Sequence, residues 1–375
     1  MKKDNRIPVS VLTGFLGAGK TTILNRILTA QAAKDIVVII NEFGEVGIDH
    51  ELIETSLEET ILLQSGCLCC ALLGNLSNTL KSLLTKKITG KLSFSRVLIE
   101  TSGIANPGPI LQTLLIDPKL AKAFKFDGLI AVVDSVNAYR ALDAHDEAVQ
   151  QVAMADLILL SKADITPDAK VLRLKARLKK FNTIAKIKSV NNVKLELDEF
   201  FGLFAMRANA STTAISKWLD ISEAPERTLE GISGLTSSLN SNNLVSTRSL
   251  PSKKHAKQIV SASIEIKTPM SAELFDFWLD GLILKKGMDL LRLKGLVHFE
   301  GAQYPIVFHG VQHIFDPPIE LMGWTKDKRV SKIVIIAKNT EEQKLVEALQ
   351  VLRTTKEIWK KTRSGMMVQT IDLNF

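Results

Sequence analysis

In the first half of the chain, short apolar runs alternate with longer segments of helical spacing. Beta-branched residues dominate the short runs, whereas apolar positions three and four apart mark the segments between them. Strands that alternate with helices form a parallel sheet, because each crossover helix returns the chain to the same end. We therefore expect a doubly wound α/β domain. Its expected strands are Pro8 to Leu12, Ile36 to Ile40, Thr60 to Leu63, Arg96 to Glu100, Leu129 to Asp134, Leu157 to Ser161 and Ile184 to Val190.

The pattern changes between residues 208 and 257, where Ser, Thr, Asn and Gly replace the apolar clusters and predict a flexible linker. We expect one domain over residues 1–207, this linker, and a smaller α+β domain over residues 258–375. The expected elements of the smaller domain are strands at Ile259 to Ile266, Leu290 to His298, Tyr304 to Phe308 and Lys332 to Ala337, a helix from Met270 to Leu284 behind Pro269, and a helix that ends at Leu352 and begins with a capping box of Thr340 and Gln343.

Composition narrows the class of protein. The chain has 375 residues, of which 46% are hydrophobic, enough for two packed cores. Its apolar runs are far shorter than the roughly 18 residues of a membrane span, and the start of the chain, which faintly resembles a signal peptide, fits a strand and a loop better. The net charge of +8 comes from scattered basic residues, so we expect no nucleic-acid partner.

A phosphate-binding loop is predicted between the first strand and the first helix. Residues 14–21 read Gly-Phe-Leu-Gly-Ala-Gly-Lys-Thr and fit the pattern G-x-x-x-x-G-K-[ST]. Backbone N–H groups of such a loop surround phosphates, the lysine reaches the β- and γ-phosphates, and the threonine hydroxyl binds Mg²⁺. The expected nucleotide-binding residues here are Gly14, Gly17, Ala18, Gly19, Lys20, Thr21 and Thr22, and Thr22 is placed at the α-phosphate.

Two later strand ends complete a nucleotide site. The sequence Glu100-Thr-Ser-Gly103 places a carboxylate near the Mg²⁺ and the Gly103 N–H near the γ-phosphate, so Lys20, Thr21 and Glu100 are the expected catalytic residues. The sequence Ser161-Lys-Ala-Asp164 is similar to the guanine-reading element N/T-K-x-D. In that element the aspartate accepts two hydrogen bonds that adenine cannot donate, and the lysine stem covers the base, so Lys162 and Asp164 favour GTP over ATP.

The chain's three cysteines, Cys67, Cys69 and Cys70, fall within four residues and follow the third expected strand. They cannot form a disulfide framework, which favours a reducing, cytoplasmic compartment. Three thiolates behind Gly66 suit a soft or borderline cation such as Zn²⁺ or Cu(I), provided that the chain turns there. Two alternatives remain open, namely cysteines buried as small apolar residues and a redox sensor.

These motifs together resemble the CobW-type family of metal-handling GTPases. The resemblance is carried by residues 14–22, by Asn41-Glu-Phe-Gly-Glu-Val-Gly47, by Gly66-Cys-Leu-Cys-Cys70, by residues 100–103 and by residues 161–164, and it extends more loosely through Arg292-Leu-Lys-Gly295 and Trp324. It implies a GTP-hydrolysing metal chaperone whose cysteines carry zinc or another divalent transition metal. It also implies that a glutamate near the thiols joins the site, which by position is Glu42, with Glu45 in reserve.

The sequence departs from the family pattern in ways that affect function. Ser161 stands where Asn or Thr is usual, so weaker guanine affinity is expected, and Glu100 stands where many GTPases use Asp, although CobW-type proteins share the Glu. The linker lacks the His-rich tract of some relatives. The leading hypothesis is delivery of a metal to a client metalloprotein, and the alternative is a regulatory GTPase switch with structural cysteines. A homo-oligomer stays open, and an ATP-dependent kinase or ligase lacks support.

Three further features have simpler expected explanations. A second metal site at His298, His309 and His313 is less expected than structural histidines. The segment from Lys170 to Lys188 carries eight Lys or Arg and no acidic residue, which is typical of a solvated crossover helix. Asp134 is expected to cap the turn that follows its strand.

Overall fold

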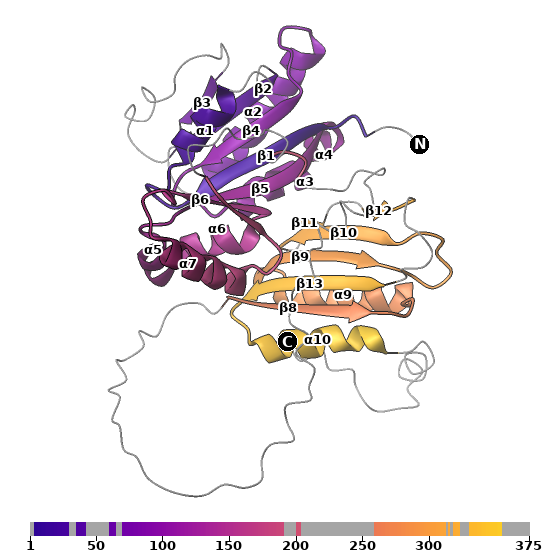
Figure 1. The fold of residues 1–375 in the computed structure, drawn as a ribbon. Helices are drawn as coiled ribbons and strands as arrows, with labels where there is room; N and C mark the ends of the chain where they lie inside the picture. The colour runs from indigo at the N-terminus through magenta and orange to yellow at the C-terminus, as the bar shows by residue number, and fades with distance from the viewer. Residues whose placement is uncertain are drawn as a thin grey trace, which may run out of the picture.

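Two sheets organise the chain in a computed structural model that describes residues 4–29, 35–42, 60–64, 70–190, 200–203, 259–312, 314–315, 318–322 and 330–354. The strands of the larger sheet are β1 (Ile7–Gly14), β2 (Ile36–Glu42), β3 (Thr60–Gln64), β4 (Arg96–Thr101), β5 (Phe124–Asp134), β6 (Leu157–Ser161) and β7 (Lys186–Ser189). Their order is β3-β2-β4-β1-β5-β6-β7, and every neighbouring pair is parallel (Figure 1). The predicted doubly wound α/β class is confirmed.

Helices cover both faces of this sheet. They are α1 (Lys20–Leu28), α2 (Cys70–Ile88), α3 (Gly108–Ile116), α4 (Pro118–Ala123), α5 (Ala138–Ala144), α6 (Asp146–Met154) and α7 (Asp168–Phe181). Along β1, Val9 and Val11 pack in the core formed with α2, α3, α5, α6 and α7, whereas Leu12 faces the core formed with α1. This alternation follows from the two-residue period of a strand. A strand buried on both faces must be apolar throughout, which explains the continuous runs in the sequence.

The second sheet is antiparallel and lies beyond residue 258. Its strands are β8 (Ile259–Ile266), β9 (Leu290–Val297), β10 (Ile306–Val311), β11 (Ile314–Phe315), β12 (Ile319–Glu320) and β13 (Ser331–Lys338), and its helices are α9 (Ala272–Lys286), α10 (Glu342–Gln350) and the 3₁₀ turn η4 (Val351–Arg353). The order is β11-β10-β9-β13-β8, with β12 beside β10. Trp278 of α9 is fully buried against one face, as the predicted α+β class requires. The predicted linker and Trp324 lie outside the described residues.

Local details of two helices differ from the expected ones. The predicted capping box is wrong. Glu341, not Thr340, is the residue before α10, and its side chain makes no hydrogen bond that caps the helix. The Thr340 hydroxyl has no hydrogen-bond partner among the described residues. Gln343 instead donates to Glu347 one turn later, as exposed residues four apart on a helix do. Helix α9 begins after Ser271, whose hydroxyl accepts from the Leu274 N–H, because Met270 still bridges to Phe299 in extended conformation.

The basic segment after Lys170 forms a crossover helix, as expected. Val171, Leu174 and Leu178 of α7 are buried at helical spacing, and they face the core of the larger sheet. Lys179 near its end donates to the carbonyl oxygens of Thr183 and Ala185. The helix therefore buries one apolar stripe and carries its basic residues beside that stripe.

The two sheets meet through the face of the smaller sheet that points away from α9. Leu291, Val334 and Ile336 of that face belong to the same apolar core as α6 and α7. Figure 1 shows β8, β9 and β13 lying beside these helices. At the edge of the contact, Gln112 of α3 donates to Gln312, 2.7 Å away, just after β10.

A buried charge cluster lies inside this contact. Asp156, between α6 and β6, accepts hydrogen bonds from Arg292 and from Lys294 (2.7 Å), both on β9. Its second oxygen accepts the Leu129 N–H of β5 at 3.0 Å, and Arg292 also donates to the Met154 carbonyl at the end of α6. One carboxylate therefore ties a strand and a helix end of the first sheet to a strand of the second.

The cluster has a net positive charge, which sets the protonation of its members. Burial alone raises the pKa of Asp156, but Arg292 and Lys294 outweigh it and hold the pKa below its usual range. Burial, with help from Arg292, lowers the pKa of Lys294 to about 8. Burial also lowers the pKa of His309, on the adjacent strand β10, well below its usual value, so this histidine is neutral and packs against the Phe126 ring.

We predict that Asp156→Asn lowers the free energy of unfolding by about 3–5 kcal/mol, because two buried cations lose their counter-charge. Urea unfolding measures the loss, and Asp143→Asn is the control, since Asp143 is 65% exposed in its pair with Arg177 and exposed pairs contribute about 1 kcal/mol or less. The folded-state pKa of Asp156 is depressed, so its contribution exists above the unfolded pKa of about 4 and fades as pH falls. A deficit that stays constant from neutral pH to about pH 2 would contradict this account.

Candidate functional site

The predicted phosphate loop lies between β1 and α1. Gly17 and Gly19 have φ angles of 69° and 90°, in the left-handed region that favours glycine. A side chain at Gly14 would place its Cβ 2.4 Å from the Val132 carbonyl oxygen, so the close packing of β1 on β5 also requires glycine. The sequence motif therefore has the backbone that its glycines predict.

The first turn of α1 leaves its backbone donors available. The N-cap residue that precedes it, Gly19, provides no side-chain cap, and the first turn contains no acidic residue. Lys20 is buried at this helix start, and Thr22 is exposed in the same turn. Unsatisfied N–H groups and the helix dipole together attract an anion, so this turn suits a phosphate group.

A hydroxyl and a carboxylate meet beside the loop, as the sequence predicts. Thr21 Oγ1 lies 3.4 Å from Glu100 Oε1, and Glu100 is only 3% exposed at the end of β4. The parallel register of β1 and β4, which pairs Leu12 with Glu100, brings the two motifs together. Oxygen ligands of this kind suit Mg²⁺, so the donor set fits the ion that the sequence predicts.

The segment after β4 packs directly on the phosphate loop. A Cβ at Gly103 would lie 2.8 Å from the Leu16 nitrogen, so only glycine fits at this approach. The Gly103 carbonyl in turn accepts a hydrogen bond from the Gln151 amide of α6 at 3.1 Å, and so does the Ala105 carbonyl at 3.0 Å. Gln151 therefore holds the segment in place, a role that no feature of the sequence indicates.

Residues of the third predicted element hold the phosphate loop from the β6 side. The Ser161 hydroxyl donates to the Ala18 carbonyl at 2.6 Å, and Lys162 Nζ donates to the Gly17 carbonyl at 3.2 Å. Lys162 has a φ angle of 53°, and Asp164 is exposed two residues later. Ser161, which stands where Asn or Thr is usual, thus makes one hydrogen bond to the loop, although its side chain is shorter than that of Asn.

Asp134 at the end of β5 has the capping role that the sequence predicts. Its carboxylate accepts the backbone N–H groups of Val136 and Asn137, at 2.8 and 3.2 Å, and pairs with Lys162 Nζ at 2.7 Å. Burial raises the pKa of Asp134, but hydrogen bonds from Lys162 and Asn137 outweigh it and lower the pKa. The carboxylate therefore stays charged and holds Lys162 toward the loop.

The predicted transition-metal ligands lie only partly within the described backbone. Glu42 ends β2 and is paired in register with Gln64, the last residue of β3, while Cys70 begins α2. Cys67, Cys69 and Glu45 lie outside the described residues. The backbone thus brings the ends of β2 and β3 to one edge of the sheet, where the segment that contains Cys67 and Cys69 begins.

The histidines do not form a second metal site within the described ranges. His298 and His309 are both buried in the smaller domain, and His313 lies outside the described residues. Nowhere in the described part of the chain do three or more potential ligands cluster. In the same ranges, every helix is too short or too polar to cross a bilayer.

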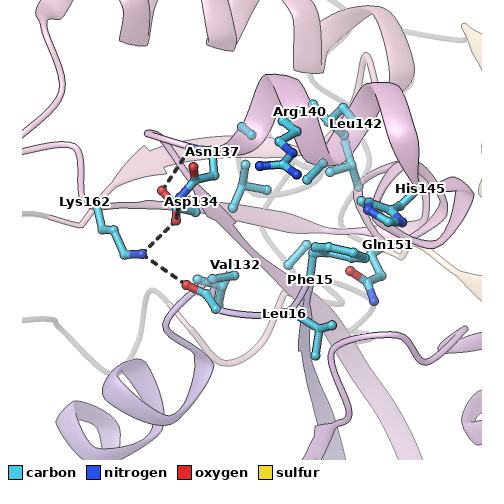
Figure 2. A pocket seen from close by; sticks show the side chains of 18 residues that line it. Phe15, Leu16, Val132, Asp134, Asn137, Arg140, Leu142, His145, Gln151 and Lys162 are labelled. Carbon is cyan, nitrogen blue, oxygen red and sulfur yellow. Dashed lines mark hydrogen bonds and ion pairs between the residues drawn. The ribbon is translucent and has the colours of Figure 1, made fainter.

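A cavity of about 340 Å³ adjoins the phosphate loop, between Phe15 and Leu16 on one side and α5 and α6 on the other (Figure 2). Lys162 and Asp134 lie at one end of it, and His145 and Gln151 at the other. Its volume falls in the range of small-molecule sites. The sequence gives no sign of this cavity, because its walls come from segments far apart in the chain.

Comparisons with known proteins match both domains. Residues 8–189 match the family model described as CobW/HypB/UreG, nucleotide-binding domain, and residues 259–353 match the cobalamin synthesis protein cobW C-terminal domain. The zinc chaperone YjiA of Escherichia coli is 32% identical over 93% of this chain and 99% of its own length. The zinc-regulated GTPase metalloprotein activator 1 of Schizosaccharomyces pombe is 30% identical over 83% of this chain and 76% of its own.

A solved structure supports the same relationship. The crystal structure of Zn(II)-bound YjiA GTPase from E. coli aligns with a TM-score of 0.65 at 29% identity, and it covers 93% of this chain and 100% of its own. Both the parallel sheet and the antiparallel sheet are therefore shared with a protein of known structure.

We predict that Ser161→Ala weakens GDP binding roughly fivefold to tenfold, because the buried Ala18 carbonyl loses a hydrogen bond that contributes about 1 kcal/mol. Calorimetric titration measures the change. Ser95→Ala is the matched control, since the exposed Ser95 hydroxyl bonds the Asp35 carbonyl far from the loop. Equal affinity in the wild type and Ser161→Ala would show that the loop is held without this bond.

Proposed function

The chain belongs to the CobW/HypB/UreG family, and from that premise we propose that it is a GTPase that carries zinc and delivers it to a client metalloprotein. The observation that carries the nucleotide half of the proposal is the meeting of Thr21 and Glu100 beside an uncapped helix start. The family model and the relatives named as zinc chaperones and GTPases support both halves.

In the proposed mechanism, the chain positions GTP for in-line hydrolysis. The N–H groups from Gly17 to Thr22 hold the phosphates, and Lys20 neutralises charge on the β- and γ-phosphates. Thr21 and Glu100 would hold Mg²⁺, which would stabilise the negative charge of the phosphates. The Gly103 N–H, on a segment that Gln151 holds against the loop, is proposed to contact the γ-phosphate.

Guanine selection is assigned to Lys162 and Asp164. Lys162 donates a hydrogen bond to the Gly17 carbonyl, which holds its side chain beside the phosphate loop, and its stem is proposed to cover the base. Asp164 is exposed two residues further on and has two oxygens for the guanine N1–H and amino group.

The proposed metal site consists of Cys67, Cys69 and Cys70, with Glu42 as a fourth ligand. Three thiolates and a carboxylate suit zinc. Closed four-ligand sites are usually structural, so delivery would require a coordination position to open, with the three cysteines holding the metal in an incomplete site. Support comes from the strand register, because Glu42 pairs with the last residue of β3, from which the thiol segment continues. Zinc is the cargo in this proposal, because the relatives include a zinc chaperone and a zinc-regulated GTPase metalloprotein activator.

Strand β2 offers a route between the two sites. Its end pairs with β3 through Glu42 and with β4 through Asn41 and Thr101, next to Glu100. A change in the chain after β2 upon γ-phosphate binding would therefore alter the neighbourhood of the thiol segment. The alternative function, a regulatory GTPase switch with structural cysteines, requires no such link between nucleotide and metal.

We predict that GTP binds more tightly than ATP and that Asp164→Asn reduces this preference roughly tenfold or more, because an amide cannot accept both guanine hydrogen bonds. Competition binding of GTP and ATP measures the ratio. Asp168→Asn, in the first turn of α7, removes a nearby exposed charge and should leave the ratio unchanged. Equal affinity of the native protein for the two nucleotides would refute guanine selection.

We predict that zinc affinity, measured by thiol-competition titration, differs between nucleotide-free, GTP-analogue and GDP states by roughly 5- to 150-fold, the range of allosteric pairs. Linkage requires zinc to change GTP-analogue affinity by the same factor. Cys69→Ser and Cys70→Ser should weaken zinc binding. Lys20→Ala, which loses the phosphate contact, should retain zinc binding but lose its response to nucleotide.

The result separates the two functions. Equal zinc affinity in all three states would remove the delivery mechanism, and absence of cysteine-dependent zinc binding would favour the regulatory switch.

A further inference from the structure

The cavity beside the phosphate loop lies apart from the proposed phosphate site. Phosphates are held by the N–H face of the loop, whereas the cavity lies toward its carbonyl face. Lys162, which lines the cavity, donates to the Gly17 carbonyl from that side and pairs with Asp134. Figure 2 shows this pair at one end of the cavity, with Phe15 and His145 at the other. If the loop holds a nucleotide on its N–H face, this space stays open, although Gly17, Ala18 and Lys162 line it as well.

Gln151 places a buried, unpartnered acceptor at this cavity. Its side chain is 1% exposed, and its Nε2 donates to two carbonyls, those of Gly103 and Ala105. Both bonds need the amide nitrogen, so the orientation of the amide is fixed. Its Oε1 then has no hydrogen-bond partner among the described residues. A buried acceptor without a donor costs free energy, which a donor on a ligand would recover.

Arg140 provides the complementary charge. Its side chain extends from α5 over the cavity in Figure 2, and no bond or ion pair joins its guanidinium to any residue of the described ranges. The nearest acid that lines the cavity, Asp134, is already neutralised by Lys162 and by its hydrogen bonds to the following turn. A free guanidinium beside a neutralised carboxylate favours an anionic group on a ligand, above all a carboxylate, which it can bind with two parallel bonds.

The remaining walls favour a flat apolar body. The rings of Phe15 and His145 are stacked with centroids 4.4 Å apart and planes 28° from parallel, and they present a continuous aromatic wall. Val132, Leu142 and Val152 line the cavity with apolar side chains. Aromatic and aliphatic walls of this kind bury a planar ring well.

We propose that this cavity binds a small aromatic carboxylic acid that carries an N–H or O–H donor. Its carboxylate pairs with Arg140, its donor reaches Gln151 Oε1, and its ring lies along Phe15 and His145. This site goes beyond the proposed GTPase and zinc functions. Because Gln151 also holds the segment at Gly103, the bound acid braces that segment against the phosphate loop, and the site couples a small metabolite to the nucleotide centre.

The test uses full-length protein saturated with GDP and Mg²⁺. The probes are indole-3-carboxylate, indole-3-acetate and indole-3-propionate, which share a ring and a donor and differ in the reach of the carboxylate. Ligand-observed saturation-transfer NMR gives affinities, with tryptamine as the cationic counterpart and the N-methylated acid as the counterpart without a donor. At least one acid should bind saturably, excess GDP should not displace it, and tryptamine and the N-methylated acid should bind more weakly.

Variants locate the binding. Arg140→Gln removes an exposed charge without touching the core and should weaken the acid roughly tenfold or more. Ala141→Phe fills the cavity and should abolish binding, while Arg173→Ala on α7, whose guanidinium bonds the Ala169 carbonyl of its own helix, should change nothing. In wild-type protein the amide signals of Gly103 and Ala105 should shift as the acid binds. Absence of binding by all three acids, displacement by GDP, or binding that Arg140→Gln leaves unchanged would overturn the proposal, and none of these results bears on GTP hydrolysis or zinc binding.

Discussion

The relative placement of the two sheets depends on one buried carboxylate. Asp156 satisfies a backbone N–H of β5 and neutralises two cations of β9, so neither sheet can move without stranding charge in the interior. Hydrophobic contact alone tolerates sliding, whereas paired charges fix a register because their energy depends steeply on distance and direction. Arg292 also bonds the end of α6, the helix whose Gln151 holds the segment after Glu100. The smaller domain therefore bears on the same helix as the nucleotide centre.

Neighbouring segments support the phosphate loop from two sides. Ser161 and Lys162 hold its carbonyl groups from β6, and Gly103 approaches it from β4. A loop that its neighbours hold in place loses less entropy when phosphates bind, so more of the contact energy is available for affinity. The same supports come from the strand ends that carry the motifs proposed to read the base and to hold Mg²⁺. The residues that support the phosphate loop and those proposed to recognise the nucleotide are thus neighbours at the ends of the same strands.

Much of this was predictable because it depends on local sequence. The apolar runs predicted each strand of the large sheet, and the glycine spacing predicted the loop, since both express backbone constraints within a few residues. Gln151 and the Asp156 cluster were not predictable, because their partners lie far away in the chain and only the packed fold brings them together. The capping box at Thr340 failed for a related reason: the pattern fits many sites, and tertiary packing decides where a helix begins.

The position of β3 at the rim of the sheet has a consequence for how such proteins diversify. Within the described part of the chain, β3 pairs with β2 alone, and the segment with the cysteines continues from its end. Residues that follow a rim strand have few neighbours to accommodate, so insertions or exchanged ligands there leave the central strands undisturbed. If the cysteines hold the metal as proposed, selection can alter the chosen metal in small steps while the GTPase site is inherited intact. The fold thus separates the GTPase site, on central strands, from the proposed metal ligands, which follow a rim strand and can be exchanged more readily.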